Sequence, residues 1–142
     1  MTKARLVSLI LAGAVGAAAL AIVAAAPVSA GARLTPQEQL AKALAGRVAG
    51  KPVDCINPRL NTETKIIDRT AIIYGSGRTV YLQRPNGANW LNDDDVLVTE
   101  LRGSGDLCSI DLVRLHDRNG LWSRGSVTLN QFVPYTRVAA RD

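Results

Sequence analysis

The sequence predicts an α+β fold that is mainly β: one N-terminal amphipathic helix packed on a small antiparallel sheet or partly closed barrel of five to seven short strands. Three observations support this fold. An apolar leader stands apart in composition, one segment has helical periodicity, and the remainder consists of short apolar runs separated by Gly, Asn, Asp and Pro. We expect a cleavable signal peptide at 1–30 and a single small disulfide-linked domain at 31–142, with its helix at about 36–48 and its β region at about 55–135.

The leader has the order of parts of a secretory signal. Lys3 and Arg5 give a positive start, an apolar run covers 6–26, and Pro27 precedes small residues up to Ala30. We expect cleavage after Ala30. A membrane anchor is the alternative, because about 20 apolar residues can span a bilayer. The predominance of Ala and Gly favours cleavage, so no stable membrane anchor is expected in the mature chain. The leader contains no twin Arg, which favours the general secretory route to the periplasm or the exterior.

The net charge of the chain limits which classes of binding partner are expected. The chain of 142 residues has a net charge of +5. All 12 acidic residues and 15 of the 17 basic ones lie in 31–142, so the expected mature domain carries +3. A charge this mild, on a protein expected in the envelope, argues against a nucleic acid partner. It is compatible with anionic envelope material.

Cys55 and Cys108 are the only cysteines, and both lie in the part expected to be exported. In an oxidising compartment such a pair favours one disulfide. In the chain-entropy model that cross-link stabilises the fold by about 4 kcal/mol. The alternative is a Cys nucleophile served by His116, but no residue beside either cysteine would lower a thiol pKa. The sequence therefore predicts a structural disulfide.

The helix has a clear beginning. Thr35 is the expected N-cap, Pro36 occupies the first helical position, and Glu38 completes a capping box. Its apolar face repeats every four residues and is widened by alanines: Leu40, Leu44, Val48, Ala41 and Ala45. Gly50 and Pro52 are expected to end it. This face predicts packing on a sheet, with a membrane or a partner helix as the alternative.

Short runs rich in β-branched residues predict the first strands at 65–68, 70–74, 79–82 and 96–101. Gly75-Ser76-Gly77 offers residues that accept a positive φ, so the two strands around it are expected to form a hairpin. Residues 84–95 are rich in Pro, Asn, Gly and Asp and predict a loop anchored by Trp90 and Leu91.

The segment 108–115 alternates, with Cys108, Ile110 and Leu112 on one face. Arg114 shares that face. If the face is inward, Arg114 is buried and needs a carboxylate partner, for which Asp54 and Asp68 are the candidates.

Asn119-Gly120 predicts a type I′ hairpin turn. Further β segments are expected after it at 121–122, 127–129 and 132–135. Pro134 lies in the last of these and lacks a backbone N–H, which favours a position at a sheet edge.

Three segments carry a family resemblance: Lys-Pro-Val-Asp-Cys-Ile at 51–56, Leu-Cys-Ser-Ile-Asp-Leu-Val-Arg-Leu at 107–115, and the closing 125–135. With the signal peptide and the capped helix, they resemble small secreted proteins of alphaproteobacteria. The resemblance covers nearly all of the expected mature chain. It implies compartment and domain limits but no activity, because no function is assigned to that family.

The densest acidic cluster is Asp93, Asp94 and Asp95, a weak candidate for a Ca²⁺ site. An EF-hand loop places its ligands at alternate positions and ends on a Glu at the twelfth. Here the three Asp are consecutive, and consecutive side chains diverge in an extended segment. We expect a solvated loop, no metal site and no cofactor.

No catalytic constellation is visible. His116 is the only histidine, and Asp117 beside it makes a general base conceivable. The sequence contains no GxSxG motif. The glycine-rich segments 75–77 and 103–105 neither lead into a helix nor carry the Lys-Ser/Thr of a P-loop. We expect no catalytic residues.

The arginines of the β half could form an anion-binding face: Arg78, Arg84, Arg102, Arg114, Arg118 and Arg124. The sequence thus favours a periplasmic or secreted, non-enzymatic binding or structural module of the cell envelope. Its expected partner is an envelope protein or an anionic envelope component. A small exported enzyme and a secreted enzyme inhibitor are the alternatives.

Overall fold

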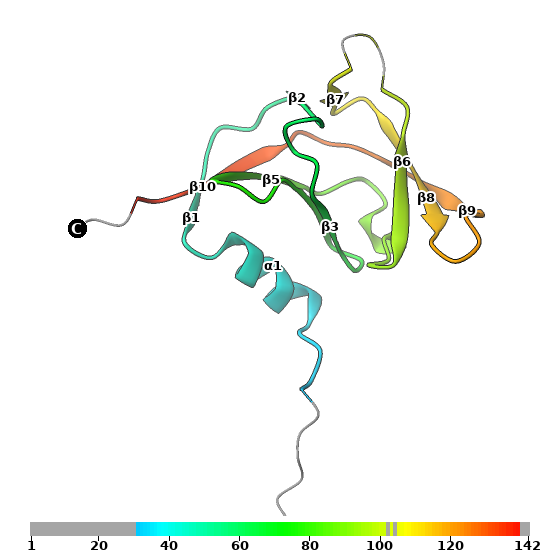
Figure 1. The fold of residues 1–142 in the computed structure, drawn as a ribbon, viewed down its shortest axis with the longest axis horizontal. Helices are drawn as coiled ribbons and strands as arrows, with labels where there is room; N and C mark the ends of the chain where they lie inside the picture. The colour runs from blue at the N-terminus through cyan, green and yellow to red at the C-terminus, as the bar shows by residue number, and fades with distance from the viewer. Residues whose placement is uncertain (1–30, 102, 104, 140–142) are drawn as a thin grey trace, which may run out of the picture. The chain divides into compact units, whose positions relative to one another are not determined.

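The computed structural model describes residues 31–101, 103 and 105–139. These residues form one α-helix, one 3₁₀ turn and ten strands (Figure 1). In chain order the elements are α1 (Pro36–Leu44), β1 (Arg47–Ala49), β2 (Cys55–Ile56), β3 (Thr64–Ile67), β4 (Ala71–Tyr74), β5 (Thr79–Gln83), η1 (Ala88–Trp90), β6 (Asp95–Thr99), β7 (Leu107–Cys108), β8 (Leu112–Asp117), β9 (Ser123–Thr128) and β10 (Val133–Arg137). The signal peptide predicted at 1–30, with its cleavage after Ala30, lies outside the described residues.

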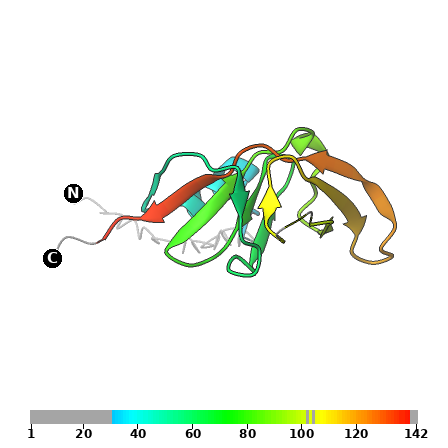
Figure 2. The same cartoon turned by 90° about the horizontal axis from the view of Figure 1, so that it is seen from above.

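The strands of this region form three antiparallel sheets, and none of them closes. Their strand orders are β1-β10-β5-β4-β3, β2-β7 and β6-β8-β9. Figure 2 shows β8 and β9 at the opposite end of the domain from the tip of β10. The predicted fold class, α+β and mainly β, is confirmed. The strands number ten rather than five to seven, and the helix lies at 36–44 rather than at the N-terminus of the chain.

Helix α1 begins as predicted and ends earlier. The Thr35 hydroxyl accepts from the Glu38 N–H at 3.3 Å, and the Glu38 carboxylate accepts from the Thr35 N–H at 2.7 Å. The predicted end at residue 48 is wrong. Gly46 adopts a φ of 69°, which turns the chain away from the helix axis. Residues 47–49 then pair with β10, so the hydrogen bonds of a sheet replace those of a last helical turn.

The apolar side of α1 covers one face of the five-stranded sheet (Figure 1). Leu40, Ala43 and Leu44 of the helix pack on a buried cluster from the sheet: Ile67, Ala71, Ile73, Val80 and Leu82. Val48, which was predicted on the same helical face, is exposed on β1. The predicted packing of helix on sheet is therefore correct, over two turns rather than three. No helix within the described ranges is long and apolar enough to span a membrane.

The capping box gives α1 a pH dependence. Hydrogen bonds from the Thr35 N–H and hydroxyl lower the pKa of Glu38 below its usual value. Because the pKa is lower in the folded state, this stabilisation is present above the unfolded value of about 4.3 and is lost as pH falls through the folded pKa. We therefore expect wild type to lose stability relative to Glu38→Gln as the solution is acidified. Urea unfolding of both proteins at neutral and acid pH measures the difference, and a constant difference would contradict the prediction.

The second part of the core lies between the sheets. Its largest fully buried side chain is Phe132, whose ring meets Tyr74 edge-on with centroids 5.8 Å apart. The predicted disulfide joins Cys55 of β2 to Cys108 of β7, which are register partners with Cα atoms 4.0 Å apart. The disulfide thus holds together the smallest sheet, whose Ile56 and Leu107 belong to the same core cluster.

The alternation predicted over 108–115 is out of phase with the structure. Ile110 is 84% exposed, whereas Val113 and Leu115 are fully buried. The cause is a turn between β7 and β8. The buried Asp111 carboxylate accepts from the Cys108 N–H at 2.8 Å, and the Asp111 N–H donates to the Cys108 carbonyl at 3.0 Å. The turn breaks the predicted strand in two and reverses which residues of the second half face the core.

Both predicted hairpins exist, but one uses a different turn. The β4–β5 hairpin turns at Gly75, with a φ of 87°, as expected. In the β8–β9 hairpin the type I′ prediction is wrong, because the residue with positive φ is Leu121, at 55°. The Asp117 carboxylate accepts from the N–H groups of Asn119 and Gly120 and so satisfies two amides of a five-residue loop.

Two local predictions about single residues fail. Leu91 is buried as expected, but Trp90 is exposed. Pro134 lies on β10 between β1 and β5, not on an edge. Its carbonyl accepts from the Gly50 N–H at 2.7 Å, just beyond the end of β1. The backbone N and C=O of one residue point to the same side of a strand. The side of Pro134 that lacks an N–H therefore faces the end of β1, and no hydrogen bond to β5 is lost.

Candidate anion-binding groove

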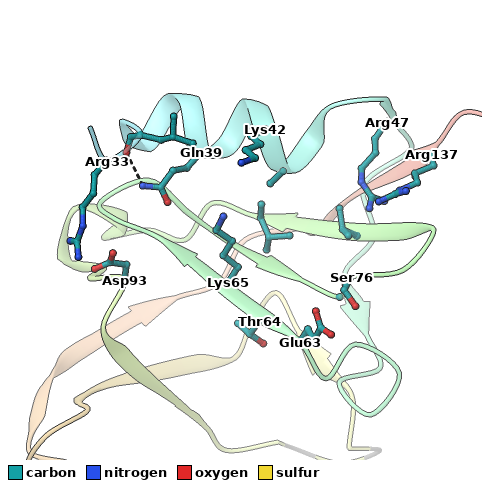
Figure 3. Close-up of a pocket in the computed structure, with 15 residues that line it drawn as sticks. Arg33, Gln39, Lys42, Arg47, Glu63, Thr64, Lys65, Ser76, Asp93 and Arg137 are labelled. Atoms are coloured by element: carbon teal, nitrogen blue, oxygen red, sulfur yellow. Dashed lines mark hydrogen bonds between the residues drawn. The ribbon is translucent and has the colours of Figure 1, made fainter. Parts of the chain in front are cut away.

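An open groove with a volume of about 720 Å³ lies between α1 and the five-stranded sheet (Figure 3). Its charged lining consists of five cations and two carboxylates: Arg33, Lys42, Arg47, Lys65, Arg137, Glu63 and Asp93. Cationic side chains therefore dominate the groove, although the sheet beneath α1 is apolar.

Lys42 and Lys65 approach the groove from opposite walls. Lys42 lies in the last turn of α1 and reaches down, while Lys65 reaches up from β3 (Figure 3). Lys65 shares a face of β3 with the buried Ile67, so it continues the surface that α1 covers. Within the described part of the chain, neither ammonium group has a hydrogen-bond or ion-pair partner.

Arg47 and Arg137 sit at the other end of the groove (Figure 3), side by side as register partners on β1 and β10. The Arg47 guanidinium donates to the carbonyls of Arg78 at 2.7 Å and Gly77 at 3.0 Å, which fixes its position. Burial lowers the pKa of Arg47, and the charge of Arg137 lowers it further. Two guanidinium groups held together without a carboxylate between them favour an anion as the third group.

The two carboxylates lie along the β3 side of the groove. Asp93 is near Arg33, and Glu63 is near Ser76 at the opposite end (Figure 3). Gln39 on α1 donates to the Leu34 carbonyl at 2.9 Å, which holds the segment before the helix against the groove. The arrangement can bind an extended anion at several points, with the carboxylates limiting where negative groups fit.

No family model, no curated protein and no solved structure matches this chain. What the chain does therefore has to be inferred from its own groove and surfaces.

The three consecutive Asp do not converge on one point. The Asp95 side chain is 1% exposed and pairs with Arg124 at 2.5 Å, whereas Asp94 pairs with Arg118 at 3.7 Å. Asp93 faces the groove. Among the described residues there is no group of three or more His, Cys, Asp or Glu that could hold a metal ion.

Arg114 is not buried. Its side chain is 53% exposed and pairs with Glu100 at 3.3 Å. The proposed partners Asp54 and Asp68 instead contact Gln131 and Arg69. The inward face on which a buried Arg114 depended is not observed, because the turn between β7 and β8 reverses the phase of the strand.

His116 lies at the β8–β9 hairpin and is half-buried. Its Nδ1 lies 2.7 Å from the Leu121 carbonyl, an acceptor, so Nδ1 donates and carries the proton. This bond orients the ring against its own turn. His116 does not line the groove.

The cations that line the groove are not the arginines that the sequence suggested for anion binding. Arg102 lies outside the described residues, and none of the other five proposed arginines lines the groove. Arg114, Arg118 and Arg124 are paired with carboxylates. Sequence reasoning missed Lys42 and Lys65, although they are two of only three lysines in 31–142.

Proposed function

We propose that this chain is an exported, non-enzymatic module of the cell envelope that binds a polyanionic envelope component in the groove beside α1. Export by the general secretory route, with cleavage after Ala30, is supported by the order of parts in residues 1–30. The Cys55–Cys108 disulfide suits an oxidising compartment outside the cytoplasm. The resemblance to small secreted proteins of alphaproteobacteria agrees with this compartment.

The observation that carries the proposal is the set of cations without partners. Lys42, Lys65 and Arg137 face one groove, and none of these side chains has a carboxylate partner among the described residues. Surface cations are usually interspersed with acids, as they are elsewhere on this domain. Each such cation contributes about 1 kcal/mol toward an anionic surface at moderate salt. Phosphate groups repeated along an envelope glycolipid or polymer would engage several cations at once.

The test measures binding of protein exported from the full chain and purified from the periplasm of a bacterial host. The probes are lipopolysaccharide, vesicles of phosphatidylglycerol with phosphatidylcholine, vesicles of phosphatidylcholine alone, and soluble polyphosphate. We expect binding to the anionic probes and not to phosphatidylcholine alone. Added salt should weaken it. The strongest anionic probe identifies whether a lipid-borne or a free phosphate is preferred.

Lys42→Glu/Lys65→Glu should weaken that binding at least about tenfold, because two attractive charges become repulsive. The matched control is Arg59→Glu/Arg84→Glu, which changes the net charge equally at exposed positions outside the groove. An equal loss in both proteins would show that net charge, not the groove, binds the anion. Absence of binding to every anionic probe would contradict the proposed function itself.

A further inference from the structure

A second site lies where two sheet edges face each other. β3 is an edge strand of the five-stranded sheet, β6 is an edge strand of the three-stranded sheet, and they are not hydrogen-bonded neighbours. Two adjoining pockets of about 260 and 230 Å³ separate them, and Thr64 of β3 and Leu97 of β6 line both. The two pockets lie next to each other along the two strands and are together referred to below as the β3–β6 cleft.

The backbone of β3 points its free groups into this cleft. The Glu63 carbonyl accepts from the Gly75 N–H at 2.7 Å, so Glu63 faces β4. In an antiparallel pair, every second residue of a strand forms backbone hydrogen bonds to its neighbour. The backbone groups of Lys65, two residues after Glu63, therefore also face β4. The N–H and C=O groups of Thr64 and Ile66 consequently face away from β4, toward β6.

The backbone of β6 also points free N–H and C=O groups into the cleft, from the side opposite β3. The Asp117 N–H donates to the Trp122 carbonyl, and the Asp111 carbonyl accepts from the Leu129 N–H, so odd-numbered residues of β8 face β9. The even-numbered residues of β8 then bond to the even-numbered residues of β6. The N–H and C=O groups of Leu97 and Thr99 are left facing the cleft.

A buried hydroxyl gives an independent sign that the cleft has a ligand. Tyr74 lines the cleft and is only 5% exposed, yet its hydroxyl has no hydrogen-bond partner among the described residues. Buried polar groups without a partner are rare in folded proteins. Burial raises the pKa of this hydroxyl, so it stays protonated and is a donor that lacks an acceptor among the described residues.

We propose that an extended peptide segment of another protein binds in the β3–β6 cleft as an added strand, with the Tyr74 hydroxyl donating to a peptide oxygen. A strand is the occupant that fits, because its N–H and C=O groups alternate to both sides and would meet backbone groups on both walls. Alternate side chains of the peptide would point inward, where Ile66, Leu97 and Leu107 offer apolar contacts. The recognised sequence is therefore short, extended and apolar at every second position.

The probe is a library of random peptides displayed on phage and selected on the exported protein. The selected peptides are synthesised, and their binding is measured by calorimetry and by amide hydrogen exchange. We expect peptides with alternating apolar residues. In the free protein the amides of Thr64, Ile66, Leu97 and Thr99 should exchange quickly, and bound peptide should protect them. Recovery of no peptide, or of peptides that leave these amides unprotected, would overturn the proposal.

Thr64→Pro removes one N–H that faces the cleft without removing a bond to β4, and an edge strand tolerates such a proline. It should abolish peptide binding, whereas Thr64→Ala, which keeps the N–H, should not. Tyr74→Phe changes no backbone group and should weaken binding by roughly fivefold, the loss of one hydrogen bond. Binding unchanged in both Thr64→Pro and Tyr74→Phe would place the peptide elsewhere. The Lys42→Glu/Lys65→Glu protein should still bind the peptide, which separates this site from the anion groove.

Discussion

Replacing Cys55 and Cys108 together by alanine is expected to lower the free energy of unfolding by about 4 kcal/mol. The disulfide closes a loop between residues 53 positions apart, so its loss returns much conformational freedom to the unfolded chain. The loss is a large share of the stability of a domain of this size. Urea unfolding of the wild type and the variant, followed by circular dichroism, measures it.

Reduction of the wild-type protein provides the internal control, because it breaks the same bond without changing the sequence. We expect reductant to destabilise the wild type by a similar amount and to leave the double alanine variant unchanged. A difference between wild type and variant below about 1 kcal/mol would mean that the unfolded chain is already compact around this loop.

Arg124→Ala is expected to lower the free energy of unfolding by about 3 kcal/mol, because it leaves the Asp95 carboxylate buried without its cation. Asp95 is 1% exposed, pairs with Arg124 at 2.5 Å and also accepts from the Asn92 N–H at 3.1 Å. After the substitution that N–H is the one remaining donor described for the carboxylate. Thermal and urea unfolding measure the loss.

The neighbouring pair of Asp94 and Arg118 is a matched control. It lies one residue away, spans 3.7 Å and is largely exposed, so Arg118→Ala should cost about 0.5 kcal/mol or less. Asp95→Asn combined with Arg124→Ala should recover part of the stability, because no charge is then buried alone. Equal losses of unfolding free energy in Arg124→Ala and Arg118→Ala would contradict the argument that burial of the Asp95 carboxylate sets the size of the loss.

Structural features that depend on a few adjacent residues could be predicted from the sequence. The capping box of Thr35 and Glu38 and the turn at Gly75 both act within four residues, and both are present. The disulfide followed from the cysteine count and the expected compartment. These predictions needed no knowledge of which strand lies beside which.

Features that depend on distant pairing could not be predicted. The helix ends early because residues 47–49 find partners in β10, almost ninety positions later. The same pairing places Arg47 beside Arg137, so the cationic end of the groove has no local signature. Over 108–115 the pattern alone could not reveal that Asp111, a polar residue, would be buried in a turn.

The position of β10 has a consequence for the order of folding. The last strand of the chain lies inside the five-stranded sheet, between β1 and β5. Until it is available, β1 has no neighbour in the sheet and β5 lacks one of its two. Such long-range closure is slow, because the loop entropy is lost before the contacts form. A chain threaded through a membrane pore from its N-terminus could therefore complete the five-stranded sheet only after β10 had crossed.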